Sequence, residues 1–147
     1  MAELSSSDRE HAVDSARTVL QGRKIAFITG AGVSTDSGIP DYRGEGSLPR
    51  TPMDIRAFLT SHAARQRYWA GGHRGYQAFS ATEPNPSHRA IARFEGSGDA
   101  LGVITQNVDG LHLKAGSEHV VELHGTARNI ICTECGQVFD GSSRTRV

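Results

Sequence analysis

Three short apolar runs in this 147-residue chain each end at polar residues that could do chemistry. The first run ends at Thr29 and continues into Gly30-Ala31-Gly32, where glycine would let the backbone approach a phosphate group closely. The next glycine is Gly38, and no acidic ribose ligand closes a second strand about 20 residues on, which disfavours a nicotinamide dehydrogenase. The pattern therefore indicates a nucleotide site of another kind, with a loop that binds nothing as the alternative.

A polar, turn-rich stretch follows these glycines and is typical of a loop that folds over a ligand. The second run ends at TQNVDG (105–110), where Gln106, Asn107 and Asp109 would offer donors and acceptors to a ribose. The alternative is a loop in which Asn and Asp side chains satisfy their own backbone. The polar residues of the first stretch are Ser34, Ser37, Asp41, Tyr42 and Arg43.

The third run ends at ELHG (122–125), which places His124 at the end of a predicted strand. Gly125 leaves space beside this ring, and histidine is the side chain whose neutral form is available as a base near physiological pH. A lone histidine is more often structural, so the residue types alone leave both roles open. The remaining histidines, expected to be surface or core residues without a base role, are His11, His62, His73, His88, His112 and His119.

The elements that would position these residues are three strands, predicted over 24–29, 101–105 and 119–123. Chemistry at the carboxyl end of each strand is the pattern of a doubly wound parallel sheet. We therefore predict an α/β, Rossmann-like fold with long helical insertions between the first two strands.

Helices are expected before the first strand and within the insertions. An opening helix is predicted over 7–22, starting at a capping box from Ser7 to Glu10. A second helix is predicted from Pro52 to Trp69, and the glycines that follow, Gly71, Gly72 and Gly75, are expected to break it. Ser87 is expected to cap a further short helix.

The composition limits the classes of partner. Lysine plus arginine and aspartate plus glutamate are both 16, so the formal net charge of zero gives no reason to expect nucleic acid or a membrane as a partner. No apolar stretch approaches the ~18 residues needed to cross a bilayer, and the N-terminus lacks the pattern of a secretory signal. We therefore expect a cytoplasmic protein, in which the pair Cys132 and Cys135 indicates metal or redox chemistry more than a structural disulfide.

Four motifs in a fixed order carry a specific resemblance. They read GAGVSTDSGIPDYRG from Gly30, TQNVDGLH from Thr105, ELHG from Glu122 and CTEC from Cys132. Together they resemble the sirtuin (Sir2) family of NAD-dependent protein lysine deacylases, over about 24–136. The sequence Arg67-Tyr68-Trp69 and the stretch EPNPSHRAI from Glu83 most resemble class II of that family.

The resemblance implies deacylation of an acyl-lysine protein or peptide, with NAD consumed as a co-substrate. In the implied reaction the amide oxygen of acyl-lysine attacks C1′ of the nicotinamide ribose, and nicotinamide leaves. His124 would then act as general base on a ribose hydroxyl that attacks the resulting imidate, giving O-acyl-ADP-ribose, while Asn107 and Asp109 would hold the nicotinamide ribose and the expelled nicotinamide. The resemblance assigns catalysis to His124 and Asn107, and cofactor binding to Gly30, Ala31, Gly32, Ser34, Ile39, Asp41, Tyr42, Arg43, Gln106, Asn107, Val108 and Asp109.

The resemblance also implies a structural Zn²⁺ held by four cysteines, of which this chain carries Cys132 and Cys135. We expect one incomplete catalytic domain over 1–147, with an NAD-binding part over 24–125 and the start of a zinc module over 126–147. Two alternatives stay open, an inactive NAD-binding fragment and an NAD-dependent protein ADP-ribosyltransferase. Self-association through the incomplete sheet or zinc site is a further hypothesis, in which two chains pair to complete a four-cysteine site.

Overall fold

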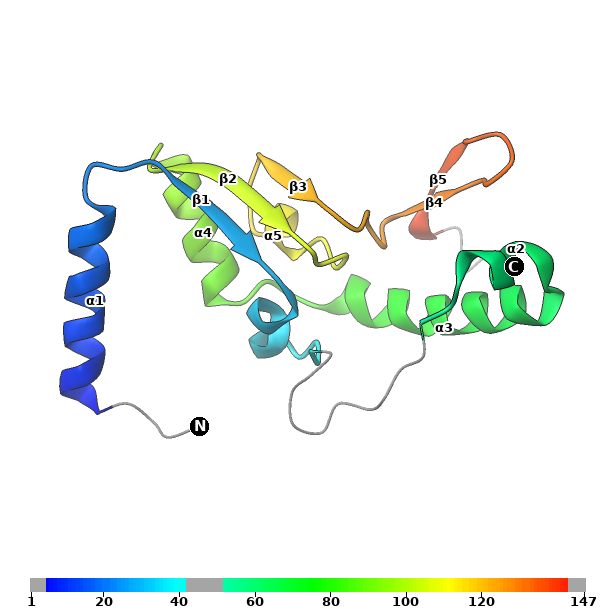
Figure 1. Cartoon of the computed structure of the whole chain (residues 1–147), viewed down its shortest axis with the longest axis horizontal. Coiled ribbons are helices and arrows are strands. Elements are labelled where there is room, and N and C mark those ends of the chain that lie inside the picture. The colour runs from blue at the N-terminus through cyan, green and yellow to red at the C-terminus, as the bar shows by residue number, and fades with distance from the viewer. Residues whose placement is uncertain (1–4, 42–51, 143–147) are drawn as a thin grey trace.

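The computed structural model describes residues 5–41 and 52–142 and is organised around a parallel sheet (Figure 1). Its strands are β1 (Ile25–Thr29), β2 (Ala100–Thr105) and β3 (Val120–Glu122), paired in the order β1-β2-β3. Thr29 lies opposite Thr105, and Thr105 lies opposite Glu122, so the three carboxyl ends are level at one end of the sheet. The predicted three parallel strands are confirmed.

Helices α4 (Pro86–Gly96) and α5 (Leu111–Lys114) lie on one face of this sheet (Figure 1). Phe27 of β1 packs on Phe94 of α4, with ring centroids 5.9 Å apart. Successive side chains of a strand point to opposite faces, so the other face carries Ile28 and Val121, which are 76% and 56% exposed. In the described part of the chain this apolar face is open to solvent.

Helix α1 (Ser6–Leu20) starts one residue before the predicted boundary and ends two residues before it. Its N-cap is Ser5, whose Oγ accepts a hydrogen bond from the backbone N–H of Asp8 at 3.1 Å. The predicted capping box from Ser7 to Glu10 is wrong, because Ser5 makes the capping bond and leaves Ser7 inside the first turn. The helix buries no side chain and stands apart from the sheet (Figure 1).

The single helix predicted from Pro52 to Trp69 is two helices, α2 (Ile55–Thr60) and α3 (His62–Ala81). Ser61 separates them and caps α3, since its Oγ accepts from the N–H of Ala64 at 3.3 Å. The predicted break is also wrong, because α3 continues through all three of its glycines. A glycine inside a helix costs about 1 kcal/mol relative to alanine, which weakens a 20-residue helix without ending it.

The N-cap of α4 is Asn85 rather than the predicted Ser87. Its Oδ1 accepts hydrogen bonds from the backbone N–H groups of Ser87 (2.9 Å) and His88 (3.3 Å). In return, the backbone N–H of Asn85 donates to Nδ1 of His88 at 3.4 Å, which completes a capping box. Pro86 occupies the first helical position, which needs no N–H donor. The Asn85 amide also donates to the carbonyl of Val33 at 2.7 Å, which ties α4 to the segment after β1.

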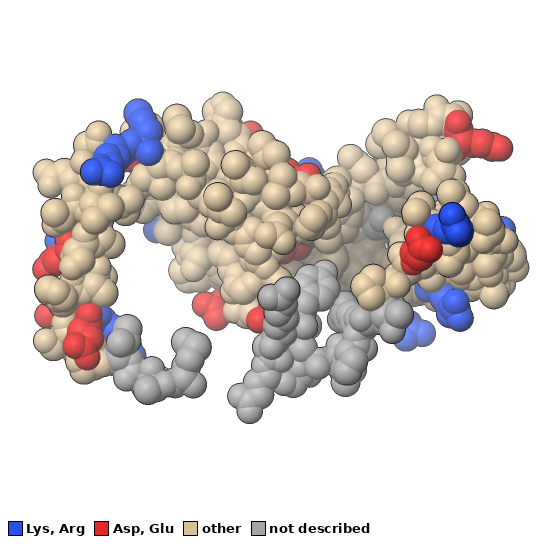
Figure 2. All heavy atoms as spheres, viewed as in Figure 1, with Lys and Arg blue, Asp and Glu red and all other residues tan. Residues whose placement is uncertain are grey.

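A separate antiparallel hairpin of β4 (Asn129–Ile131) and β5 (Val138–Asp140) follows the sheet. It falls within the segment predicted to start a zinc module. Among the described helices, none combines the length and apolar character that crossing a membrane requires. Figure 2 shows acidic and basic side chains scattered over the visible face without a large patch of one sign, in keeping with the zero net charge.

Glu95, near the end of α4, fixes the loop that enters β3. Its carboxylate accepts hydrogen bonds from the backbone N–H groups of Glu118 (3.2 Å) and His119 (2.6 Å), and it lies 2.7 Å from Nδ1 of the His119 ring. The Glu95 side chain is only 8% exposed. Burial raises the pKa of this carboxyl, but the hydrogen bonds from His119 and Glu118 together outweigh it and leave the pKa below its ordinary value.

We expect Glu95→Gln to lower the free energy of unfolding by about 1.5–3 kcal/mol at neutral pH, because the side chain loses its charge and one of its two acceptor oxygens. Since the folded-state pKa is depressed, this stabilisation is present above the unfolded-state pKa and is lost as pH falls through the folded-state pKa. Urea titrations of both proteins at neutral and acidic pH test this. A difference that does not depend on pH, or an equal effect of Glu10→Gln on the exposed helix α1, would contradict it.

Candidate active site

Polar residues at the carboxyl ends of β1 and β2 form one hydrogen-bonded cluster. β1 leads into the 3-10 helix η1 (Ala31–Ser37), in which Ser34 is fully buried. The Ser34 hydroxyl donates to Oδ2 of Asp109 at 2.8 Å and accepts from Nδ2 of Asn107 at 3.1 Å. Nδ2 of Asn107 also donates to the carbonyl of Gly30 at 3.1 Å. The fold therefore brings the glycine-rich segment and the TQNVDG segment together.

A cavity of about 190 Å³ opens beside this cluster. Pro40 of the first motif lines it as well. So do Gly75 and Phe79, which could not be predicted because only the course of α3 brings them to the strand ends. Gly30, Gly32 and Asp41 are described but do not line this cavity, and Tyr42 and Arg43 lie outside the described residues. The predicted cofactor residues that line it are Ala31, Ser34, Ile39, Gln106, Asn107, Val108 and Asp109.

Two buried histidines lie behind the cluster, with ring centroids 4.8 Å apart. Nε2 of His88 is 3.5 Å from the Ser34 hydroxyl, and Nε2 of His112 is 2.9 Å from Oγ1 of Thr29. Burial lowers the pKa of His88, and burial followed by the neighbouring His88 lowers the pKa of His112 to about 4, with Asp109 opposing both shifts. Both imidazoles are therefore neutral at neutral pH and belong to the core.

His124 lies exposed in the turn after β3. The N–H of Leu123 donates to the carbonyl of Thr105 at 2.9 Å, and the N–H of Gly125 donates to the carbonyl of Glu122 at 3.2 Å. Gly125 has a φ of 72°, a left-handed conformation that favours glycine. His124 and Gly125 border a second cavity of about 550 Å³, whose apolar walls come from Met53, Ile55, Phe58, Tyr68, Trp69, Ile130, Ile131 and Val138.

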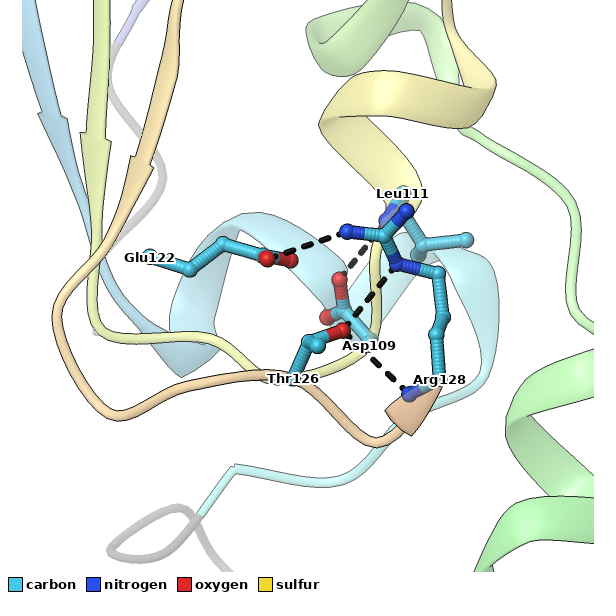
Figure 3. Close-up of polar contacts among 5 residues, drawn as sticks. All are labelled: Asp109, Leu111, Glu122, Thr126 and Arg128. Atoms are coloured by element: carbon cyan, nitrogen blue, oxygen red, sulfur yellow. Dashed lines mark hydrogen bonds and ion pairs between the residues drawn. The ribbon is translucent and has the colours of Figure 1, made fainter. Parts of the chain in front are cut away.

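The two residues predicted to be catalytic, His124 and Asn107, thus border different cavities. A backbone hydrogen bond brings their two chain segments together. The N–H of Ala127 donates to the carbonyl of Val108 at 2.9 Å; Val108 lines the smaller cavity, and Thr126 lines the larger one. The chain after His124 therefore lies against the TQNVDG segment. Figure 3 shows Thr126 and Arg128 of this part of the chain beside Asp109.

Cys132 and Cys135 lie at the turn between β4 and β5, and both are free thiols. The turn is closed by hydrogen bonds from the Cys132 N–H to the Gln137 carbonyl (2.9 Å) and from the Gly136 N–H to the Cys132 carbonyl (3.0 Å). The backbone N–H groups of Cys135 and Glu134 and the Cys135 side chain lower the pKa of the Cys132 thiol. No group of three or more potential metal ligands occurs among the described residues.

A parallel sheet that gathers polar side chains beside a cavity at its strand ends is the arrangement of a Rossmann-like nucleotide-binding protein. The family model described as "Sir2 family" matches residues 30–147. The chain belongs to the Sir2 family, as the four ordered motifs predict.

Similar proteins cover most of this chain. It is 57% identical over 118 residues to NAD-dependent protein deacetylase 1 of Mycobacterium avium, which is 80% of this chain and 42% of the relative. It is 42% identical over 135 residues to the mitochondrial NAD-dependent protein lipoamidase sirtuin-4 of Bos taurus, covering 88% and 43% of the two. A solved structure of Sir2 with a p53 peptide and NAD⁺ matches with a TM-score of 0.75 at 33% identity, over 89% of this chain and 53% of that one.

The predicted α/β, Rossmann-like fold is confirmed by this structural similarity. The chain spans less than half of the length of both curated relatives and about half of the solved chain.

Proposed function

We propose that this chain forms the part of an NAD-dependent protein lysine deacylase that holds the nicotinamide ribose of NAD and the catalytic base. The observation that carries the proposal is the hydrogen bond of Ala127 with Val108, which holds the segment after His124 against the TQNVDG segment that lines the Asn107 cavity. The names of the relatives, a deacetylase and a lipoamidase that both depend on NAD, support the same reaction class.

The smaller cavity supports the binding of NAD as a co-substrate. Asn107 and Asp109 line its wall with an amide and a carboxylate, both bonded to the buried Ser34 hydroxyl, and these groups suit ribose hydroxyls and a carboxamide. Ile39 and Phe79 add apolar surface on which a nicotinamide ring can lie. We also assign cofactor binding to Gly30, Ala31, Gly32, Asp41, Gln106 and Val108, and to Tyr42 and Arg43, which lie outside the described residues.

The larger cavity supports the binding of acyl-lysine. Its walls are largely apolar, which suits the aliphatic stem of lysine and an acyl group, and His124 borders it. In the proposed reaction, NAD supplies an electrophilic C1′ and nicotinamide as the leaving group. The amide oxygen of acyl-lysine forms a bond to C1′ as the bond from C1′ to nicotinamide breaks.

His124 acts in the second part of the proposed reaction. It takes the proton of a ribose hydroxyl, whose oxygen then attacks the carbon of the former amide. Water completes the release of free lysine and O-acyl-ADP-ribose. The base therefore acts after nicotinamide has left, and the two parts of the reaction can be measured separately.

Nicotinamide release from NAD tests the proposal directly. We expect release that requires an acetyl-lysine peptide and that is accompanied by O-acetyl-ADP-ribose. Transfer of labelled ADP-ribose to protein would contradict deacylation and favour ADP-ribosyl transfer. Binding of NAD by the folded chain without turnover would contradict activity of this chain and favour an inactive NAD-binding fragment.

We further propose that Cys132 and Cys135 supply two of the four ligands of a structural Zn²⁺. Their tight turn and the lowered pKa of Cys132 support this role, because the thiolate is the form that binds metal. The other two ligands would come from outside the described residues or from a second copy of the chain.

Cys132→Ser is expected to abolish stoichiometric zinc binding, because it removes one of the two thiolates that each chain supplies to a four-ligand site. Metal analysis of the purified protein measures this, with Thr133→Ser beside it as the matched control. Equal zinc content in the two variants would contradict the site. A ratio of about one zinc per chain in the unmodified protein would exclude completion of the site by pairing, which requires two chains for each four-cysteine ion.

A cytoplasmic location and the division into an NAD-binding part (24–125) and the start of a zinc module (126–147) are also our proposals. The separate hairpin of β4 and β5 supports the division. The word mitochondrial in the name of one relative points to a different location for that protein.

A further inference from the structure

We propose that the ion pair of Glu122 and Arg128 is a positioning device that holds the turn carrying His124 against the Asp109 segment. The sequence motifs assign no function to either residue, although Glu122 begins the ELHG motif. The expected effect on catalysis rests on the proposed role of His124 as base. The expected effect on the position of the turn does not depend on that role.

The ion pair closes a loop of chain around His124. Glu122 ends β3 two residues before the histidine, and Arg128 lies four residues after it. Nη2 of Arg128 lies 3.0 Å from Oε2 of Glu122. The Glu122 side chain is 15% exposed and that of Arg128 is 49% exposed, so the carboxylate is the shielded partner.

Arg128 makes a second pair of contacts within the same loop. Its Nε donates to Oγ1 of Thr126 at 3.0 Å, and its backbone N–H donates to the same oxygen at 3.3 Å. The guanidinium thus bridges Glu122 and Thr126, from the two sides of the turn (Figure 3). A lysine ammonium would keep the charge near Glu122 but could not reproduce this planar fork.

The same side chain also lies against the Asp109 segment. A Cβ atom built on Gly110, which has a φ of 74°, would be only 3.1 Å from both Cδ and Nε of Arg128. Asp109 is itself held by the N–H of Leu111 at 2.9 Å and by the hydroxyl of Ser34 at 2.8 Å. Arg128 therefore packs on the turn that presents Asp109 while it is bonded to the turn that presents His124 (Figure 3).

An ion pair with a half-exposed arginine contributes little to global stability. We therefore expect Arg128→Met to loosen the two turns locally and to leave the sheet intact. In native-state amide hydrogen exchange followed by NMR, the N–H groups of Leu123, Gly125 and Ala127 should exchange about tenfold faster, with the Val103 N–H in β2 unchanged. Glu122→Gln should act in the same direction.

In the double variant Arg128→Met/Glu122→Gln, the three amides of the turn should exchange no faster than in Arg128→Met alone. The effects of two residues that act through one ion pair do not add. Arg17→Met is the matched control, since it removes an ion pair with Asp14 on the exposed helix α1. Unchanged exchange at the three amides of the turn would overturn the proposal, and so would acceleration that extends equally to Val103.

Catalysis gives a readout that mere unfolding would not produce. Exchange of labelled nicotinamide into NAD reports the step before the base, and O-acetyl-ADP-ribose formation reports the step that needs it. Arg128→Met should lower product formation about tenfold more than nicotinamide exchange, and Arg128→Lys should recover part of the loss. Equal loss of both would overturn the positioning role. If the unmodified protein shows no acyl-lysine-dependent turnover, the proposed function fails, and amide exchange still decides this inference.

Discussion

His124→Ala is expected to lower acyl-lysine-dependent formation of O-acetyl-ADP-ribose by about 10²–10⁴-fold, the contribution typical of a positioned general base. The ring is exposed in a turn, so its removal leaves no cavity in the core. We therefore expect the urea midpoint to change little and NAD to bind at the Asn107 cavity as before. Product formation from an acetyl-lysine peptide and NAD, measured by mass spectrometry, gives the result.

His11→Ala on helix α1 is the matched control, because it removes another exposed histidine far along the chain from the strand ends. His124→Asn keeps a polar side chain of similar size and should lose as much activity as His124→Ala. Retained product formation in either His124 variant would remove the histidine from the proposed reaction. Loss of nicotinamide exchange to the same extent as product would place its role before the base step.

Gly102→Ala is expected to lower the free energy of unfolding by about 3–5 kcal/mol, or to prevent folding. Gly102 has a φ of 135°, and a Cβ atom there would clash with the carbonyl oxygen of His119 and lie 2.7 Å from its Cβ. That carbonyl accepts a hydrogen bond from Val103 at 2.8 Å, so it cannot move away without breaking the pairing of β2 with β3. Urea or thermal denaturation measures the effect.

Gly71→Ala is the matched control for this substitution. A Cβ atom on Gly71 meets no atom within 4 Å, and the residue lies in the middle of α3. We expect this variant to be up to about 1 kcal/mol more stable than the unmodified protein, because alanine favours the helix. Similar stabilities of the two variants would show that the close approach of His119 to Gly102 is not what makes glycine necessary.

The sheet could be predicted from the sequence because each strand is an apolar run that ends at a polar motif. All three strands lie at the predicted places, and no boundary differs from the predicted one by more than one residue. The helix caps could not be predicted, because one hydrogen bond decides each of them. Ser5 and Ser7, or Asn85 and Ser87, are equally able to cap, and only the path of the chain selects between them.

The candidate site likewise contains residues that could be predicted from the sequence and residues that could not. Ser34, Asn107 and Asp109 could be predicted because the ends of adjacent parallel strands meet, which is a consequence of the fold class. The contact of Arg128 with Gly110 could not, because it depends on how the chain returns after β3. Likewise, the assignment of Phe79 to the cavity depends on the direction of α3, which no spacing of residues encodes.

The hydrogen bond from Asn85 to the carbonyl of Val33 turns the segment between them into a loop with fixed ends. For a flexible loop, doubling the length costs only about 0.6 kcal/mol in closure entropy. The chain between Pro40 and Asn85 can therefore gain or lose length over evolution while Ser34 and the strand ends keep their geometry. Since α3 supplies walls to both cavities from inside this loop, ligand preference can diversify there without rebuilding the cluster that surrounds Asn107.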